Sequence, residues 1–188
     1  DRGWSKIRNV IRHKTSKTIY QVRTSNSLVE VTEDHSLLNA IAEPLKPAVA
    51  SGEYLLFSSH PLTSVGLKSI SHANLSTMRE ELQHNSVLIT TSQLEATVHW
   101  HRLNQVKLNP IINYQDGKYY VLNGNIPTYK HEYHSLCRSV IELGPTIDYV
   151  YDLETDSGHF SAGIGEIVVH NTDSIFIKFQ MERADTGE

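Results

Sequence analysis

The segment GEIVVHNTDSIFIKF, residues 165–179, places His170, Asn171 and Thr172 in succession between two apolar runs. The side-chain amide nitrogen of Asn171 could attack its own main-chain carbonyl, close a succinimide ring and break the following peptide bond. This cyclisation is slow in solution, because the amide is a weak nucleophile and the departing amine needs a proton. His170 could donate that proton or polarise the carbonyl. Holding the reacting groups together replaces a bimolecular encounter, a term of up to about 7–11 kcal/mol.

Three further side chains could extend this chemistry. His159, in GHFSAGI, is a second imidazole that could activate the Asn171 amide. The Thr172 hydroxyl could attack an upstream ester and take over its acyl group, provided that a nearby base or charge activates it. Asp152, in VYDLET, is the acidic candidate for that activation. The tripeptide alone is more simply explained as an Asx turn, so the catalytic interpretation depends on the surrounding sequence.

The composition limits the classes of protein that the chain could represent. It has 188 residues, enough for one domain or for one domain with an insertion. With 39% hydrophobic and 20% charged residues, it can bury a core. The net charge of −4 argues against nucleic-acid binding by bulk charge. No signal peptide and no apolar run of membrane-spanning length is recognisable, so we expect a soluble intracellular protein without a membrane partner.

The elements that would position these residues are predicted to be mainly β. Residues 17–38 are typical of a β-hairpin with its turn at Ser25-Asn26-Ser27, and residues 43–52 of a loop. A short strand is predicted in GEYLLF, and three more strands in IDYVYDLET, GHFSAGI and GEIVVH. The basic stretch RNVIRHKTSK, residues 8–17, could contact nucleic acid, but it favours a solvated strand edge protected by charge.

Residues 58–140 have a different pattern, which predicts a small α+β insertion. ISHANLSTMREELQHNS and TTSQLEATVHWHRLNQVKLNP have apolar residues at helical spacing. In the second segment, Ser92 and Glu95 form a possible capping box, and Pro110 stops the helix. Asp116-Gly117 then predicts a hairpin with a type I′ turn.

The chain resembles an intein, a self-excising protein-splicing element. VYDLETDSGHFSAGIGEIVVHN is similar to the two C-terminal splicing blocks of that family, and VEVTEDHSLL to an N-terminal block with the pattern T-x-x-H. The resemblance implies the horseshoe-like β fold called Hint, built from residues 1–57 and 141–171. It implies no metal or organic cofactor for splicing.

Roles for individual residues follow from the resemblance. Thr32 and His35, in the T-x-x-H pattern, would hold and activate the upstream scissile peptide. Asp152 would position or activate Thr172, which would accept the upstream host segment. His159 and His170 would assist the cyclisation of Asn171. Inteins begin with a nucleophile well upstream of T-x-x-H, and DRGWSKIRNVIRHK resembles the middle of their N-terminal half. We therefore expect an N-terminal segment in the same precursor or in trans.

The segment TDSIFIKF resembles the second half of the YGDTDS motif of family B DNA polymerases. Viral and archaeal polymerases of that family carry inteins at this point. Residues 172–188 would then begin the C-terminal host segment, and the partners would be the two polymerase segments, with DNA bound only through the polymerase. Asp173 would bind Mg²⁺ in the spliced polymerase, because nucleotidyl transfer needs carboxylates that hold the metal ions. The resemblance implies a virus-encoded protein.

The insertion resembles the helix-plus-hairpin element of a LAGLIDADG homing endonuclease, in SQLEATVHWHRLNQVKLNPIINYQDGKYYVL. The acidic motif of that family is missing, so we expect a degenerate remnant without DNA cleavage. A homing endonuclease that still binds DNA and an inactive Hint module are the alternative interpretations.

Other residues could suggest a metal site or a thiol nucleophile. His99 and His101 are two residues apart on a predicted helix and therefore point to different faces. His131 and His134 are three residues apart, without the H-E-x-x-H pattern. Cys137 is the single cysteine, which excludes an internal disulfide, and it is more typical of a small buried side chain than of a nucleophile.

Overall fold

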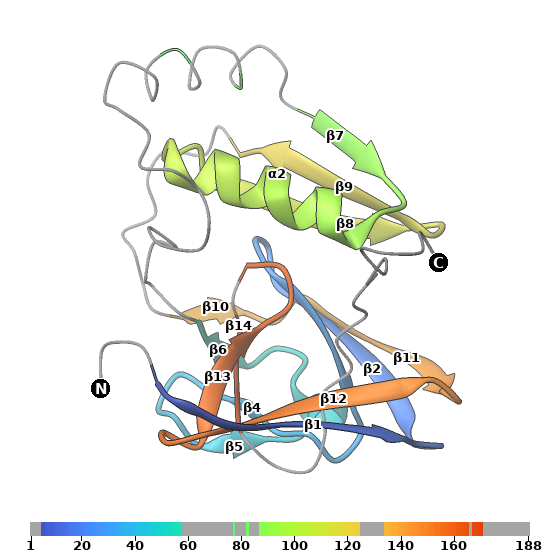
Figure 1. The fold of residues 1–188 in the computed structure, drawn as a ribbon. Coiled ribbons are helices and arrows are strands. Elements are labelled where there is room, and N and C mark those ends of the chain that lie inside the picture. Colours follow the sequence, from blue (N-terminus) through green and yellow to red (C-terminus); the bar gives the residue numbers. More distant parts are fainter. Residues whose placement is uncertain are drawn as a thin grey trace, which may run out of the picture.

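The computed structural model describes residues 5–57, 77, 82, 87–124, 134–165 and 167–170. These residues are mainly β, as predicted, and Figure 1 shows their arrangement. The strands are β1 (Ile7–Lys14), β2 (Thr18–Arg23), β3 (Leu28–Thr32), β4 (Leu37–Leu38), β5 (Pro44–Leu45), β6 (Tyr54–Leu56), β7 (Val87–Thr90), β8 (Pro110–Gln115), β9 (Lys118–Asn123), β10 (His134–Leu136), β11 (Ser139–Pro145), β12 (Tyr149–Thr155), β13 (His159–Ala162) and β14 (Ile167–His170). The helices are the short 3₁₀ helix η1 (Pro47–Val49) and the α-helix α2 (Gln93–Gln105).

Four small sheets form a β framework. The strand orders are β11-β2-β3, β13-β14-β4-β5, β1-β12 and β10-β6, and every pairing is antiparallel. Strands β2 and β3 are the predicted hairpin. Strands from the two ends of the chain therefore lie side by side, since β2 pairs with β11, and β4 pairs with β14.

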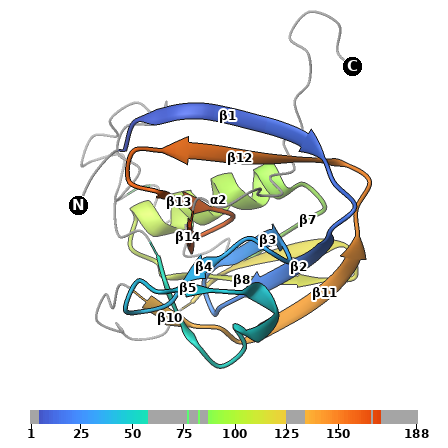
Figure 2. The same ribbon diagram turned by 90° about the horizontal axis from the view of Figure 1, so that it is seen from below.

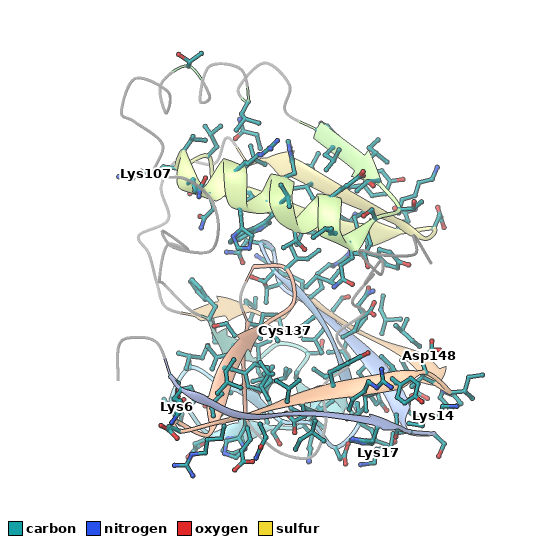
Figure 3. All side chains as sticks on the ribbon, in the orientation of Figure 1. Lys6, Lys14, Lys17, Lys107, Cys137 and Asp148 are labelled. Carbon is teal, nitrogen blue, oxygen red and sulfur yellow. The ribbon has the colours of Figure 1, made fainter. Side chains whose placement is uncertain are left out.

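The framework encloses one apolar core. Its members come from nearly every framework sheet and are each at most 5% exposed: Val22, Val29, Val31, Leu37, Ala50, Leu55, Cys137, Ala162, Ile167 and Val169. Cys137 lies inside the framework (Figure 3), and burial raises the pKa of its thiol. The prediction of a buried, structural Cys137 fits this position.

The basic N-terminal stretch forms an exposed strand. β1 pairs with β12 along one edge of the framework (Figure 2), and almost all of its side chains are exposed. Lys6 lies just before the start of β1 and Lys14 at its far end (Figure 3). The Arg12 guanidinium lies 4.2 Å from the centre of the Tyr149 ring. The exposed strand was predicted, and charged side chains on such a strand discourage pairing with other chains.

The α-helix and three strands form a second layer beside the framework. The strand order is β7-β9-β8, and α2 packs on this sheet (Figure 1). Helix α2 buries Ala96, Trp100 and Leu103 and leaves Leu94 and Val98 exposed, so only one of its two apolar faces is covered.

Both ends of α2 differ in detail from the prediction. Ser92 Oγ accepts a hydrogen bond from the Glu95 N–H at 3.3 Å, but the Glu95 carboxylate accepts from the Thr90 hydroxyl instead of capping Ser92. The capping box is therefore only half formed. The helix ends at Gln105, well before Pro110, because Lys107 and Asn109 take positive φ angles of 58° and 40°.

Five strands were not predicted from the sequence: β7, β10 and β11, and the two-residue strands β4 and β5, which lie at the end of the predicted hairpin 17–38 and in the predicted loop 43–52. Strand β10 pairs with β6, so the chain is hydrogen-bonded to the framework from His134 onward, earlier than the expected boundary at residue 141. Most of the helix predicted within residues 58–86 lies outside the described residues, and Thr77 and Leu82 within it are helical. Among the described residues, no helical stretch combines the length and the hydropathy of a membrane span.

Replacing Gly163 with Ala should destabilise the protein more than the same change at Gly117. Both glycines have nearly the same positive φ, 72° and 73°, but a Cβ at Gly163 would lie 2.2 Å from the Leu28 carbonyl oxygen, whereas a Cβ at Gly117 would have open space. Gly117→Ala should cost about 1–2 kcal/mol of unfolding free energy, the backbone term alone. Gly163→Ala should cost roughly 3 kcal/mol or more, since backbone must also move.

Urea unfolding of the two variants and of the unmodified protein measures the loss of unfolding free energy in each variant. Equal losses would show that the turn containing Gly163 can move away from Leu28 without cost.

Candidate functional site

Strands β13 and β14 bring two of the predicted site residues together. His159 begins β13 and His170 ends β14, and the antiparallel register places them directly opposite each other. Cross-strand neighbours on one face have Cβ atoms about 4.5–5.5 Å apart. Ile167, Val168 and Val169 are buried, while both histidines are only half-buried. The apolar residues therefore anchor β14 and leave the paired imidazoles at the surface of the core.

The T-x-x-H segment is attached to the same end of β14. The His170 N–H donates a hydrogen bond of 2.8 Å to the Ser36 carbonyl, and Val169 pairs with Leu37. His35, the residue before Ser36, is completely buried. Two segments that are more than 120 positions apart in the chain thus meet at His170, as the predicted shared site requires.

Within that segment, Thr32 is buried and its hydroxyl has a defined direction. Thr32 Oγ1 donates to the Asp34 carboxylate at 2.8 Å, since a carboxylate can only accept. The His35 N–H donates to the Thr32 carbonyl at 3.0 Å, which closes a turn. Because the hydroxyl proton points to Asp34, the Thr32 oxygen can offer only lone pairs to a further group, such as a peptide N–H.

Asp34, within the Thr32–His35 turn, and its partner Lys17 contact the candidate site, and the sequence interpretation missed both. The Lys17 ammonium forms an ion pair with the Asp34 carboxylate, and the Lys46 ammonium donates to the Asp34 carbonyl. Burial would raise the pKa of the Asp34 carboxyl, but the hydrogen bonds from Lys17 and Thr32 and the charge of Lys17 outweigh it, so this pKa lies below its ordinary value. The Thr-x-Asp spacing was a local signal for Asp34. No local signal pointed to Lys17.

Asp152 lies in a different sheet from the histidine pair. It is buried in β12 opposite Ile11 of β1, and its carboxylate accepts a hydrogen bond of 2.8 Å from the Leu153 N–H. The end of β12 is nevertheless tied to β13, because the Thr155 hydroxyl donates to the His159 carbonyl at 3.0 Å. Asp152 is thus connected to the histidine pair through a short, hydrogen-bonded turn.

Three predicted site residues lie outside the described residues: Asn171, Thr172 and Asp173. The structure places their neighbour, His170, whose Nδ1 is buried without a hydrogen-bond partner among the described residues.

The histidines of α2, His99 and His101, belong to the α2 layer and not to the sheet that holds the histidine pair. Burial lowers the pKa of both the His99 and the His101 imidazole, and the charge of Arg102 adds to the effect at His99. In the part of the chain that the structure describes, no group of three or more His, Cys, Asp or Glu side chains could hold a metal ion.

The described residues therefore define a mainly β protein in which a histidine pair and a buried Thr-x-x-His turn meet at one end of β14, while a buried aspartate lies in the strand that precedes β13. Comparison with known proteins links the chain to a DNA polymerase of Acanthamoeba polyphaga mimivirus, at 24% identity over 307 aligned residues that include the whole chain. Since the alignment is longer than the 188-residue chain, the mimivirus protein has additional residues inside the matched region.

The chain spans 18% of the length of that polymerase, so the similarity is distant and partial. No family model and no solved structure matches the chain. The chain is therefore related to one segment of a viral DNA polymerase.

The ion pair at Asp34 predicts a pH-dependent stability. A carboxyl whose folded-state pKa is lowered contributes stability above its unfolded pKa and loses it as the pH falls through the folded value. Asp34→Asn should therefore be less stable than the unmodified protein near pH 7. The difference should shrink toward zero below about pH 3.9, the ordinary aspartate pKa. It should stay near 1 kcal/mol or less, because the pair is about one-third exposed.

Urea unfolding at several pH values between neutral and acid measures this difference. Asp148→Asn, at an exposed position, removes the same charge and serves as the control. A stability difference for Asp34→Asn that is the same at every pH would contradict the assignment.

Proposed function

We propose that this chain is a protein-splicing element, an intein, inside a virus-encoded family B DNA polymerase precursor. The observation that carries the proposal is the cross-strand pair of His159 and His170 immediately before Asn171, with the Thr32–His35 turn hydrogen-bonded to the same strand end. The distant similarity of the whole chain to one segment of a viral DNA polymerase supports the proposed host.

The histidine pair suits the cyclisation of Asn171. The Asn171 amide nitrogen attacks its own main-chain carbonyl carbon, and the peptide bond to Thr172 breaks. One proton leaves the amide nitrogen and one is taken up by the departing Thr172 amine, which leaves a succinimide at residue 171. His159 is proposed to take the first proton and His170 to give the second, because His170 precedes Asn171 in the chain and His159 lies opposite His170.

The Thr32–His35 turn is proposed to hold the upstream scissile peptide. Since the Thr32 hydroxyl donates to Asp34, it can accept the N–H of that peptide but cannot also donate to its carbonyl. We therefore assign Thr32 to the peptide nitrogen and His35 to the assistance of the leaving group. The upstream nucleophile would come from an N-terminal segment of the precursor or from a separate chain.

Transfer of the upstream host segment then falls to Thr172 and Asp152. The Thr172 oxygen attacks the upstream ester carbonyl, the ester bond breaks, and the acyl group moves to Thr172. The Thr172 proton passes through a base to the released upstream nucleophile. Asp152 is proposed as that base or as the group that positions it. None of these steps uses a metal. In the spliced polymerase, Asp173 is proposed as a Mg²⁺ ligand on the sequence resemblance alone.

The proposal divides the chain into three parts. The framework of residues 1–57 and 141–171 is the Hint splicing domain, extended by β10 from His134. The unit of α2 and its sheet lies within the insertion, residues 58–140, interpreted as a degenerate endonuclease remnant. Residues 172–188 begin the C-terminal polymerase segment.

Intact mass spectrometry of the purified chain at neutral pH tests the C-terminal step. Over a day, the chain should release a fragment that begins at Thr172, and the remainder should end in a succinimide or its hydrolysis product at residue 171. Asn171→Ala should stay intact, since alanine has no amide nucleophile. Release of the same fragment from Asn171→Ala would show that a contaminating protease cuts the chain and would count against the proposal.

The two imidazoles should each accelerate this cleavage. His159→Gln and His170→Gln should slow the release of the Thr172 fragment by roughly 10²-fold, the lower end of general acid–base contributions. His13→Gln, near the end of β1 that lies away from the β12–β13 turn, is the matched control and should cleave at the unmodified rate. If His159→Gln cleaves as fast as this control, the cross-strand imidazole has no role in the step.

A further inference from the structure

The turn between β2 and β3 connects the α2 layer to the framework. The Trp100 indole N–H, on α2, donates a hydrogen bond of 2.7 Å to the Asn26 carbonyl. The Ile112 N–H, on β8, donates to the Ser25 carbonyl at 3.3 Å, and the Arg23 guanidinium donates to the Asn113 side chain. Trp100 is only 5% exposed, and a buried indole N–H needs a partner. The α2 layer is thus fixed to this turn at several points.

The opposite side of the same turn holds the chain between β13 and β14. Leu28 and Ile164 exchange two backbone hydrogen bonds of 2.8 Å each, and the Ser27 hydroxyl donates to the Gly165 carbonyl at 2.9 Å. A Cβ at Gly163 would lie 2.2 Å from the Leu28 oxygen, and one at Gly165 would lie 2.5 Å from the Asn26 oxygen. The two turns therefore touch backbone to backbone, without side chains between them.

The apolar core of the α2 layer continues into these turns. Leu28 and Ile164 are completely buried, and they belong to the same cluster as the buried face of α2 and its sheet. Figure 1 shows the β2–β3 turn and the β13–β14 turn rising together toward α2. Removing the α2 layer would expose Leu28 and Ile164, the residues that hold the β13–β14 hairpin in place.

We propose that the α2 layer, residues 87–124, is a fixed support of the splicing framework and that Trp100 is a positioning residue for the histidine pair. Trp100 acts through Asn26 and the 163–165 turn on the register of β13 and β14, which sets His159 opposite His170. Its effect on cleavage rests on the proposed function. Its effect on the position of the histidines does not. The α2 layer then cannot be deleted without disturbing the site, because the position of the histidine pair depends on it.

Trp100→Phe in the full chain tests this role, since it keeps a buried aromatic ring and removes the donor. In protein labelled with ¹³C-histidine, the imidazole signals of His159 and His170 should shift, while that of the remote His13 should not. Release of the Thr172 fragment should slow by roughly tenfold at a temperature where the variant remains folded. Leu94→Ala, at a 62% exposed position of the same helix, should change neither measurement.

A second variant covers the case in which Trp100→Phe does not fold. Asn113→Ala removes the contact of β8 with Arg23 and should shift the same two signals by a smaller amount. Unchanged signals of His159 and His170 in a folded variant would overturn the support role, even if its melting temperature fell. If the unmodified chain does not cleave but the signals still shift, the splicing proposal fails and the positioning role stands.

Discussion

Leu28 and Ile164 exchange two backbone hydrogen bonds of 2.8 Å in a region from which their own buried side chains exclude water. Each of these groups would be costly to leave unpaired there. The pairing forces the β13–β14 turn against the β2–β3 turn, so closely that only glycine fits at positions 163 and 165. It also places two apolar side chains where α2 can cover them. The framework core, the α2 layer and the register of the histidine strands all meet at this contact.

The candidate site combines fully buried residues with residues that are only half-buried. His35 and Asp152 are buried, so their neighbours are fixed by packing. His159 and His170 are half-buried at the end of a strand pair, where a further residue can approach them. This combination suits a reaction within one chain, since the reacting groups must be held closely and the site needs no binding step for a separate substrate. The Lys17–Asp34 ion pair fixes the orientation of the Thr32 hydroxyl, because it holds the Asp34 carboxylate to which that hydroxyl donates.

Local signals in the sequence were sufficient for several elements. The hairpin of β2 and β3, the strands β12 to β14 and the helix α2 were predicted from periodicity and turn residues. Asp116 and Gly117 take positive φ angles of 51° and 73°, as the predicted type I′ turn requires. Strands β4, β5, β7, β10 and β11 were missed. β10 is very short, and β11 carries exposed Ile141 and Leu143 without a clear alternation, so their partners define them more than their own residues do.

The sequence by itself determined which side chains could react and in what order they stand along the chain: a histidine before Asn171, a hydroxyl after it and a Thr-x-x-His pattern upstream. Only the tertiary structure decided that His159 faces His170, that Ser36 is bonded to the end of β14, that Lys17 reaches Asp34 and that Trp100 reaches Asn26. The physical reason is the sequence separation over which each kind of interaction acts. Backbone conformation and apolar periodicity are set by residues a few positions apart, whereas these contacts join segments whose approach depends on how several sheets pack around one core.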